Sequence, residues 1–510
     1  MGGVIRHKVA AVQSGALVGY DGAIIEVEAD MKAGLPGLQI VGMGNKAIDE
    51  ARQRVRSAIS NSLLDFPAQK VTINLAPAEL PKDGTHLDVP IALSILVASG
   101  QLRQSEVSGA LFAGELALDG TVRPIRGAVI LAELAKQHGL RRLFVPLQNA
   151  PQARLVKSLE VIGVSSLGEL YKALKGVVSL PDGATQHAST ANSRAPSKPG
   201  PTFDAIVGHA QAKRALTIAA AGRHNLLLSG SPGAGKTLLA KSLAAIMPKL
   251  TDTEVVEVTK LHSLAVGHEG TVVTSPPFRA PHHSATLTAL IGGGLRPRPG
   301  DISLAHRGVL FLDELPEYPR ATLEALRQPL EDRVITLSRL YGYITYPADV
   351  LLVATRNPCP CGYAGDSAIA CTCTMTQINA YQQRISGPLL DRIDLRLSVS
   401  KIANEHFFNA NTLQEKQHST VVKLVLIART MQKNRYKRSN FYNAYASLAD
   451  AKRLFLMTPS ALALLNTANT KLTLSSRSYL RIIRVARTIA DLESSPNLEE
   501  RHVAEALQFR

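Results

Sequence analysis

The stretch NLLLSGSPGAGKTLLAKSLAAIM (residues 225–247) decides the fold of the larger part of this chain. Its centre, GSPGAGKT, fits the pattern G-x-x-x-x-G-K-[ST], in which glycines let backbone N–H groups curl around phosphate oxygens at the start of a helix. The apolar residues before the motif predict a buried strand, and those after it predict a helix. We therefore expect a phosphate-binding P-loop on a parallel α/β sheet. The residues of this P-loop are Gly230, Ser231, Pro232, Gly233, Ala234, Gly235, Lys236 and Thr237.

A second motif, GVLFLDE (residues 308–314), supplies two acidic residues at the end of an apolar strand. Lys236 is expected to reach the β- and γ-phosphates of ATP, and the Thr237 hydroxyl to ligate Mg²⁺. Asp313 is expected to hold the Mg²⁺ shell, and Glu314 to polarise the attacking water. The two motifs together predict ATP hydrolysis rather than nucleotide binding alone.

Two more polar residues follow later strands. The run VLLVAT (residues 350–355) is followed by Asn357, whose amide could orient the attacking water or simply belong to a turn before Pro358. Further on, Arg392 lies between two aspartates in GPLLDRIDLRL (residues 387–397). From its neighbours alone, Arg392 reads as a salt-bridged surface arginine.

The bulk properties restrict the class of protein. The 510 residues predict two or three domains. No run of about 18 uninterrupted apolar residues occurs, and the first residues lack the apolar core of a signal peptide. With four cysteines in the whole chain, these features predict a cytoplasmic protein with no membrane partner. The net charge of +16 is expected to attract polyanions such as nucleic acid, although a soluble protein can also be basic without such a partner.

The order of strand-like and helical runs divides the chain. Residues 1–180 alternate between the two and predict an α/β domain. Residues 181–202, rich in Pro, Ser, Thr, Ala and Gly, predict a flexible linker. A second α/β pattern covers 203–400, and 401–510 read almost wholly as helices.

Six blocks of sequence carry a resemblance to a known family. They are PFRAPHHS (277–284), RPGDISLAHRGVLFLDELPE (298–317), LEALRQPLE (323–331), NPCPCGY (357–363), SGPLLDRIDL (386–395) and RSYLRIIRVARTIADLE (477–493). With the P-loop, they resemble the magnesium-chelatase-like branch of AAA+ ATPases, and within it the YifB/ComM proteins, over nearly the whole chain. The resemblance implies a P-loop AAA+ core with a parallel sheet and an α-helical lid at 401–510.

The same resemblance assigns roles to individual residues. Asn357 matches sensor 1, and Arg477 matches sensor 2 at the start of a lid helix. Arg392 matches the arginine finger that a neighbouring subunit inserts toward the γ-phosphate. Ile206 and Val207 begin a segment that matches the adenine side of such ATPases. A finger that acts in trans implies a homo-oligomeric ring, which in this family is a hexamer.

Two insertions distinguish this branch from a minimal AAA+ core, at residues 262–297 and at a predicted β-hairpin over 333–348. In ring helicases of similar layout such hairpins line the central pore, although packing within the ring is an equal alternative. Arginines would contact phosphates, and histidines or a tyrosine would contact or stack on bases. The candidate DNA contacts are Arg279, His282, His283, Arg296, Arg298, Arg339 and Tyr341.

Four arginines of the lid fall on one helical face, at steps of four, three and three. Like charges on one face repel unless something acidic lies opposite. Nucleotide, a neighbour's carboxylates or DNA could each fill that place. These arginines are Arg477, Arg481, Arg484 and Arg487.

All four cysteines form one cluster, C-x-C-x₉-C-x-C. Four thiolates complete a closed tetrahedral site, so the cluster predicts bound Zn²⁺, with reduced free thiols as the alternative. The one-residue spacings are tighter than the usual two to four. The cysteines are Cys359, Cys361, Cys371 and Cys373.

The first domain resembles the proteolytic domain of Lon proteases and its relative in the recombination protein RadA. The similarity lies in the segment VTINLAPAELPKDGTHLDVPIA (residues 71–92). Where Lon has Pro followed by its nucleophilic serine, this chain has Thr85 and His86. The position of Lon's catalytic lysine is Val129. Without either member of a Ser–Lys dyad, the domain is expected to be a scaffold and not an active protease.

Taken together, the resemblance implies an ATP-driven motor on single-stranded, forked or branched DNA. The expected activity is that of a branch-migration helicase, which promotes integration of incoming DNA in natural transformation and recombination. A magnesium-chelatase-type motor subunit and a protein-remodelling AAA+ ATPase are the alternatives. A chelatase subunit lacks the Lon-like domain and needs no strongly basic surface.

Overall fold

The computed structural model describes residues 9–41, 46–80, 82, 84–178, 200–294, 297–339, 342–366, 368–402 and 417–510. These residues form two compact units. The first comprises the described residues of 1–195, 252–273 and 338–346; the second comprises those of 196–251, 274–337 and 347–510. The predicted linker at 181–202 lies almost wholly outside the described residues and stays a prediction.

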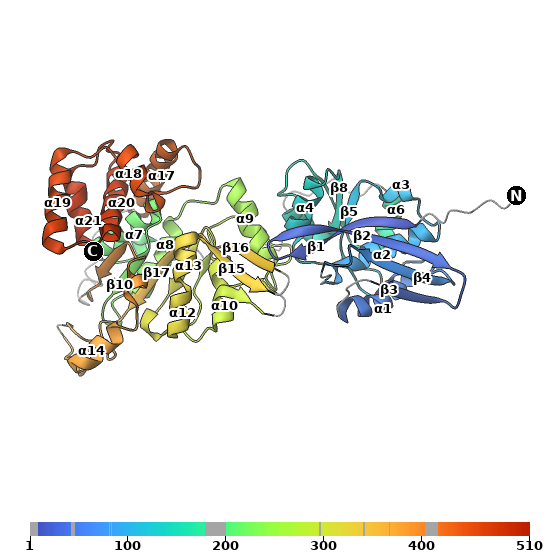
Figure 1. The fold of residues 1–510 in the computed structure, drawn as a ribbon, viewed down its shortest axis with the longest axis horizontal. Coiled ribbons are helices and arrows are strands. Elements are labelled where there is room, and N and C mark those ends of the chain that lie inside the picture. Colours follow the sequence, from blue (N-terminus) through green and yellow to red (C-terminus); the bar gives the residue numbers. More distant parts are fainter. Residues whose placement is uncertain are drawn as a thin grey trace. The chain divides into compact units, whose positions relative to one another are not determined.

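The first unit is built on a seven-stranded mixed sheet, drawn in blue to teal in Figure 1. The strand order is β3-β4-β2-β1-β5-β8-β9. β1 and β2 form an antiparallel hairpin, β2 pairs antiparallel with β4, and the remaining pairs are parallel. The strands are β1 (Ala10–Val18), β2 (Asp21–Lys32), β3 (Gly37–Val41), β4 (Lys70–Ala76), β5 (Ala110–Phe112), β8 (Arg142–Pro146) and β9 (Glu160–Val164).

The helices of the first unit complete its core. α2 is apolar on all sides and buried over most of its length, as expected of a helix that packs inside a domain. These helices are α1 (Lys46–Asn61), α2 (Asp88–Ala98), α3 (Gln104–Val107), α4 (Ala128–Gln137), α5 (Ala150–Ala153), α6 (Leu167–Leu174) and α9 (Asp252–Ser263). A small two-stranded sheet, β6 (Glu115–Leu116) with β7 (Val122–Arg123), lies in the same unit.

Helix α9 belongs to the first unit although it follows the P-loop in sequence. Lys260 Nζ lies 2.6 Å from a carboxylate oxygen of Glu133. The Gln152 amide donates hydrogen bonds to the carbonyls of His268, at 3.0 Å, and Thr271, at 2.8 Å. From the sequence, residues 262–297 are predicted to be one insertion in the ATPase core. In the structure it is divided, because these polar contacts hold residues 252–273 in the first unit.

The second unit contains a five-stranded sheet in which every pair is parallel. Its order is β11-β14-β17-β10-β18. β10 and β14 are continuous apolar runs, as expected for strands covered on both faces. The predicted parallel α/β core is therefore confirmed. The strands are β10 (Leu226–Ser229), β11 (Phe278–Arg279), β14 (Val309–Leu312), β17 (Leu351–Arg356) and β18 (Leu395–Ser398).

Helices surround this sheet. Two short two-stranded ribbons occur within the same stretch of sequence, and residues 338–346 of the second ribbon belong to the first unit. The helices are α7 (Ala210–Gly222), α8 (Lys236–Ile246), α10 (Leu287–Ile291), α11 (Asp301–Leu304), α12 (Arg320–Ala325), α13 (Arg327–Asp332), α14 (Met375–Gln382) and α15 (Gly387–Leu390). One ribbon pairs β12 (Gly292–Gly293) with β13 (Arg298–Pro299). The other pairs β15 (Val334–Arg339) with β16 (Gly342–Pro347), which confirms the hairpin predicted over 333–348.

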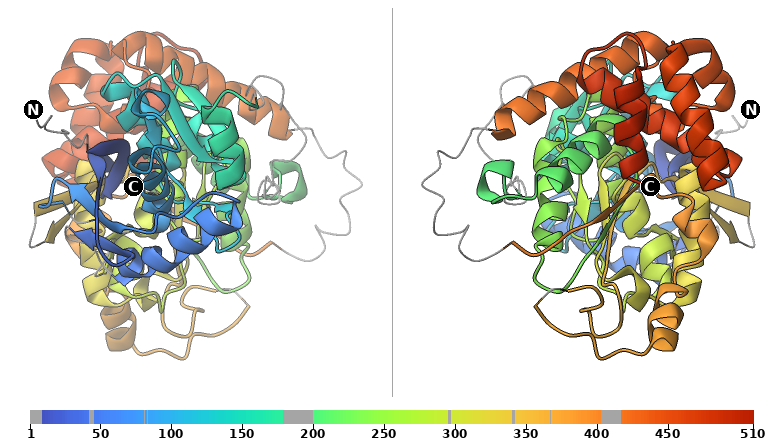
Figure 2. Two further views of the ribbon diagram at one scale, coloured as in Figure 1. Left: turned by 90° about the vertical axis from the view of Figure 1, so that its right-hand side faces the viewer. Right: turned by 90° about the vertical axis from the view of Figure 1, so that its left-hand side faces the viewer.

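The lid is helical, and α17 and α20 pack against α7 (orange to red against green in Figure 2). Side-chain caps fix where three of its helices begin: Ser447 accepts from the backbone N–H of Asp450, Thr458 from that of Ala461, and Ser475 from that of Ser478. No helix in the described part of the chain has both the length and the apolar character to cross a membrane. The lid helices are α17 (Gln417–Tyr436), α18 (Leu448–Leu454), α19 (Pro459–Leu472), α20 (Ser476–Leu492) and α21 (Glu500–Gln508).

Candidate nucleotide-binding and hydrolysis site

The P-loop connects the end of β10 to the start of α8. Gly235, the N-cap residue of α8, has φ 79°, a left-handed conformation that costs glycine little and other residues more. The free N–H groups at this helix N-terminus, together with the helix dipole, make a site for phosphate. The predicted loop thus has the local geometry that its chemistry requires.

Lys236 is buried at the first turn of α8, with 8% of its surface exposed. Its ammonium donates to the carbonyls of Gly230, at 2.5 Å, and Ser231, at 3.0 Å. It also donates to Asn357 Oδ1 at 2.9 Å, across a sequence separation of 121 residues. Burial lowers the pKa of Lys236, and the nearby carboxylates of Asp313 and Glu314 oppose that shift. The P-loop lysine and the candidate sensor 1 residue therefore lie together.

Asp313 and Thr237 also meet. The Thr237 hydroxyl donates to Asp313 Oδ2 at 3.1 Å. A hydroxyl and a carboxylate at the mouth of a P-loop are the oxygen ligands that suit a hydrated Mg²⁺ ion. The residues present therefore fit the metal that the sequence implies.

Thr355, at the end of β17, is a residue that the sequence reasoning missed. Its hydroxyl donates to Asp313 Oδ1 at 2.5 Å and accepts from the backbone N–H of Glu314 at 2.9 Å. Glu314 itself has φ 51°, which is uncommon for a residue with a side chain and typical of functional turns. Thr355 thus fixes both acidic residues. Its position two residues before Asn357 was the only available signal.

Arg392 and Arg477 converge on Glu331, a second residue that the sequence reasoning missed. Arg392 donates to the carbonyl of Pro388 at 2.8 Å and to Glu331 Oε2. Arg477 Nη2 lies 3.5 Å from Glu331 Oε1. Within one chain Arg392 is therefore salt-bridged, but to Glu331 and not to the aspartates beside it. The trans role of Arg392 and the sensor role of Arg477 stay predictions.

Three of the four lid arginines have hydrogen-bond partners within the chain: Arg481 and Arg487 are buried, and Arg484 is half-buried. Arg481 donates to the carbonyl of Ile393 at 3.0 Å, and Arg484 to that of Ala446 at 2.7 Å. Arg487 is fully buried and pairs with Asp491 at 2.9 Å. The acidic residue opposite Arg487 is Asp491, which lies one turn away on the same helix. Backbone carbonyls accept the hydrogen bonds of Arg481 and Arg484.

The adenine-side segment begins inside the core. Ile206 is buried in the main apolar cluster of the second unit, and Val207 is half-buried beside it. Their contact with a base stays a prediction.

The candidate DNA contacts have different environments. Arg279 donates to Asp301 at 2.9 Å, which supports the alternative of packing for this residue. The rings of His282 and His283 lie 4.0 Å apart between centroids. Arg298 is half-buried. Arg296, Tyr341 and the side chain of Arg339 lie outside the described residues.

One exposed aromatic of the hairpin was missed by the sequence reasoning. Tyr343, in β16, has 78% of its surface exposed. An exposed tyrosine on a strand offers a stacking surface to a base.

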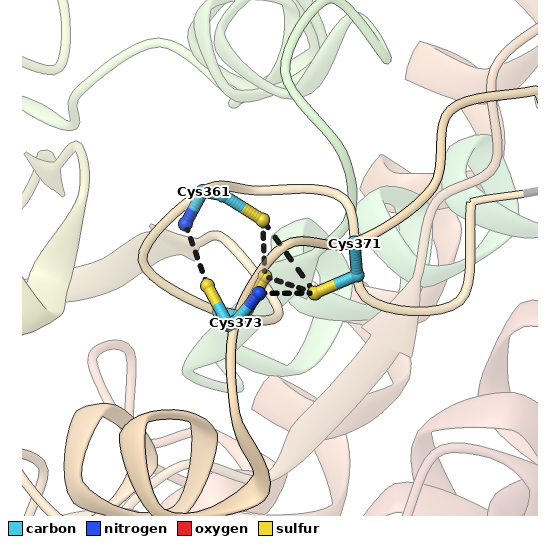
Figure 3. Close-up of side chains that lie close together, drawn as sticks. Cys361, Cys371 and Cys373 are labelled. Atoms are coloured by element: carbon cyan, nitrogen blue, oxygen red, sulfur yellow. Dashed lines mark hydrogen bonds between the residues drawn. The ribbon is translucent and has the colours of Figure 1, made fainter.

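The four cysteines form one cluster, and Figure 3 shows Cys361, Cys371 and Cys373 with their sulfur atoms close together. All four Sγ atoms lie within 4.8 Å of one another. Cys361 Sγ is 3.3 Å from Cys359 Sγ and 3.5 Å from Cys371 Sγ. Four sulfur ligands at such separations fit a tetrahedral Zn²⁺ site.

The Lon-like unit has a buried histidine at the position of the protease serine and a buried valine at that of the lysine. His86 is buried, and its Nε2 lies 2.8 Å from the carbonyl of Gly15; burial lowers its pKa. The Thr85 hydroxyl donates to the Glu115 carboxylate. Val129 is a fully buried aliphatic residue of α4. These side chains provide neither the serine nucleophile nor its lysine base.

Family models describe most of this chain. Models of the magnesium chelatase subunit ChlI match residues 202–407 and 27–149, and a model of its C-terminal part matches 415–510. The chain is similar to part of the Lon protease of Mycolicibacterium smegmatis, with 27% identity over 181 residues, which are 33% of this chain and 23% of that protease.

Several relatives match over almost their whole length, and among them are proteins named ComM and YifB. The competence protein ComM of Haemophilus influenzae is 42% identical over 505 residues, which cover 98% of this chain and 97% of that protein. The protein YifB of Escherichia coli is 40% identical over 505 residues, with the same coverage of 98% and 97%. These matches identify the chain as an ATPase motor that uses ATP and Mg²⁺. On these grounds the chain belongs to the YifB/ComM family of magnesium-chelatase-like AAA+ ATPases.

Proposed function

We propose that this protein is a cytoplasmic ring motor that hydrolyses ATP to drive branch migration of DNA. In this role it promotes the integration of incoming DNA in natural transformation or recombination. The single observation that carries the motor half is the convergence of Lys236, Asn357, Thr237 and Asp313 at one edge of the parallel sheet. The DNA half is supported by the net charge of +16 and by the relative named a competence protein.

Each residue of the site has a role in hydrolysis. Lys236 binds the β- and γ-phosphates, while Thr237 and Asp313 hold the Mg²⁺ ion, which when bound neutralises phosphate charge. Glu314 takes the proton of the attacking water, and Asn357 orients that water. Thr355 keeps Asp313 and Glu314 in place through its hydroxyl.

The active site is completed by a neighbouring subunit. Arg392 leaves Glu331 and reaches the γ-phosphate of the adjacent chain, where it stabilises the charge of the transferring group. Arg477 also leaves the Glu331 carboxylate, and it then acts as sensor 2. The resulting assembly is a hexameric ring.

DNA is held by the hairpin and by basic residues near it. Arg298 and Arg339 contact phosphates, and Tyr341 and Tyr343 stack on bases. Zn²⁺ is held by the four cysteines as a closed structural site.

A magnesium-chelatase-type motor subunit is the second candidate, favoured by the match of the ChlI models. Against it, the match to ComM covers 97% of that protein and so includes the Lon-like unit. A protein-remodelling ATPase shares the motor but needs neither the basic surface nor the exposed Tyr343.

The test is the ATPase rate with and without single-stranded, duplex and branched DNA. We expect single-stranded or branched DNA to raise the rate. Binding should be salt-dependent, with log affinity falling by about 0.7 per phosphate contact for each tenfold rise in salt. A ring that neither binds DNA at low salt nor gains ATPase activity from any DNA form would favour the chelatase-like or remodelling alternative.

A further inference from the structure

The cysteine loop, defined as residues 359–373, begins beside the nucleotide site. It follows β17 directly, and Cys359 is two residues after Asn357, which accepts a hydrogen bond from Lys236. Cys359 is fully buried. One end of the loop is therefore fixed to a residue of the ATPase site.

The middle of the cysteine loop packs on the P-loop. Gly362 has φ 88°, and a Cβ atom built on it would lie 2.6 Å from Cγ of Pro232 and 2.7 Å from Cδ. Real Cβ atoms do not approach other atoms so closely, and a proline ring has little freedom to move away. The backbone of Gly362 thus lies flat against the second variable residue of the P-loop.

A polar contact joins the two loops a few residues later. The Asp366 carboxylate lies near the Ser231 hydroxyl, and the Ala368 backbone N–H together with this hydroxyl lowers the pKa of Asp366. The same carboxylate is 3.0 Å from Lys401 Nζ, and 5% of its side chain is exposed. Lys401 also lies over the ring of Tyr363, at 5.2 Å from the centroid. The loop therefore bridges the P-loop and the segment that follows β18.

The shape of the cysteine loop depends on its sulfur atoms. Its described residues contain no helix or strand. Residues 359, 361 and 371 instead approach through their Sγ atoms, at 3.3 to 3.7 Å. In a segment of this kind, metal binding supplies the free energy that orders the backbone.

We propose that the cysteine loop is a metal-ordered support for the P-loop, so that occupancy of the cysteine site sets the affinity for nucleotide. The loop ordered by the metal would then support the P-loop through Gly362 at Pro232 and through Asp366 at Ser231. This inference rests on the proposed Zn²⁺ site and on nucleotide binding by the P-loop, and it is independent of the DNA activity.

Two glycines of the loop form a matched pair for the test. Gly362 and Gly365 both have positive φ, 88° and 79°, but nothing lies within 4 Å of a Cβ built on Gly365. Alanine at either position carries a similar backbone cost, and only Gly362→Ala collides with the P-loop. Titration with a fluorescent ATP analogue should show about tenfold weaker binding for Gly362→Ala and near-normal binding for Gly365→Ala. Both variants should retain one zinc per chain in metal analysis. Equal affinities in the two variants would overturn the inference.

The second experiment removes the metal from the cysteine site. Chelated wild-type protein and Cys361→Ser should both lose about tenfold in affinity for the ATP analogue, and added zinc should restore only the wild type. Asp366→Asn, which keeps all four ligands, should weaken binding with its zinc content unchanged. Metal-free protein with wild-type affinity would refute the coupling, and so would wild-type protein that binds nucleotide without carrying metal. A protein that behaves as expected here yet ignores DNA would instead contradict the helicase.

Discussion

Thr355 shows how one hydroxyl can organise a catalytic pair. It donates to Asp313 and accepts from the backbone of Glu314, and it is itself fully buried. The contact spans 42 residues of sequence, so the position of Thr355 two residues before Asn357 could not reveal its partners. Asp313, Glu314 and Lys236 were predictable because each lies in a short motif whose chemistry is local. Thr355 and Glu331 were not, because their partners come from other elements.

Substitutions of Glu314 and of the P-loop lysine should impair different steps of the ATPase cycle. Lys236→Ala should lose nucleotide binding, since it removes the positive charge from the phosphate site. Glu314→Gln should still bind ATP and hydrolyse it about a hundredfold more slowly, because it removes the general base. Nucleotide titration and a steady-state ATPase assay measure the two effects. Near-normal turnover of Glu314→Gln would contradict its assignment.

Thr355→Val should keep the volume of the side chain and remove its hydroxyl. A hydrogen bond to a charged group contributes about 1.5–3 kcal/mol, so kcat should fall roughly tenfold or more. KM for ATP should change little, because Lys236 is untouched. Thr355→Ser is the matched control and should restore most of the rate. Equal losses in the two variants would mean that shape, and not the hydroxyl, matters at this position.

At the scale of elements, periodicity and motif order predicted the sheet, the hairpin and the lid. Periodicity failed for the arginines of α20. It identifies which residues share a face but not what lies opposite, and here Asp491 and the carbonyls of Ile393 and Ala446 accept their hydrogen bonds. The Arg481 contact with Ile393 also ties α20 to the segment that carries Arg392.

Arg392, two residues after the end of α15, is expected to act on a neighbouring subunit. Arg392→Ala should bind ATP and form rings but lose hydrolysis, because the finger charge is missing from every interface. Mixing it with Glu314→Gln subunits should restore part of the rate where an intact Glu314 meets an intact Arg392. The measurement is ATPase activity across mixing ratios. No rescue at any ratio in demonstrably mixed rings would argue against action in trans.

The β15–β16 hairpin should couple hydrolysis to DNA movement. Tyr343→Ala removes the exposed ring from β16 and should leave the basal ATPase rate intact. The concentration of single-stranded DNA needed for half-maximal stimulation should rise about tenfold, because one base stack is lost. Tyr343→Phe keeps the ring and is the matched control. A Phe variant as defective as the Ala variant would exclude stacking as the reason.

At the scale of the whole molecule, the sequence predicted a Lon-like part and an AAA+ part from alternating elements and from motifs. It did not predict that residues 252–273, which follow the P-loop, pack in the first unit. That placement depends on contacts such as Lys260 with Glu133, between charged residues with no signature in sequence. The net charge could be read directly from the sequence, and it favours the proposed DNA motor over a chelatase subunit.

The central claim is tested most directly with a preformed three-strand DNA junction. The wild-type protein should resolve the junction when ATP is present, and should leave it intact with a non-hydrolysable analogue. Glu314→Gln should bind the junction without resolving it, because the ring then holds ATP that it cannot cleave. Gel separation of junction and products over time gives the result. Resolution without hydrolysis, or a junction that persists although the protein binds it and cleaves ATP, would contradict the branch-migration motor.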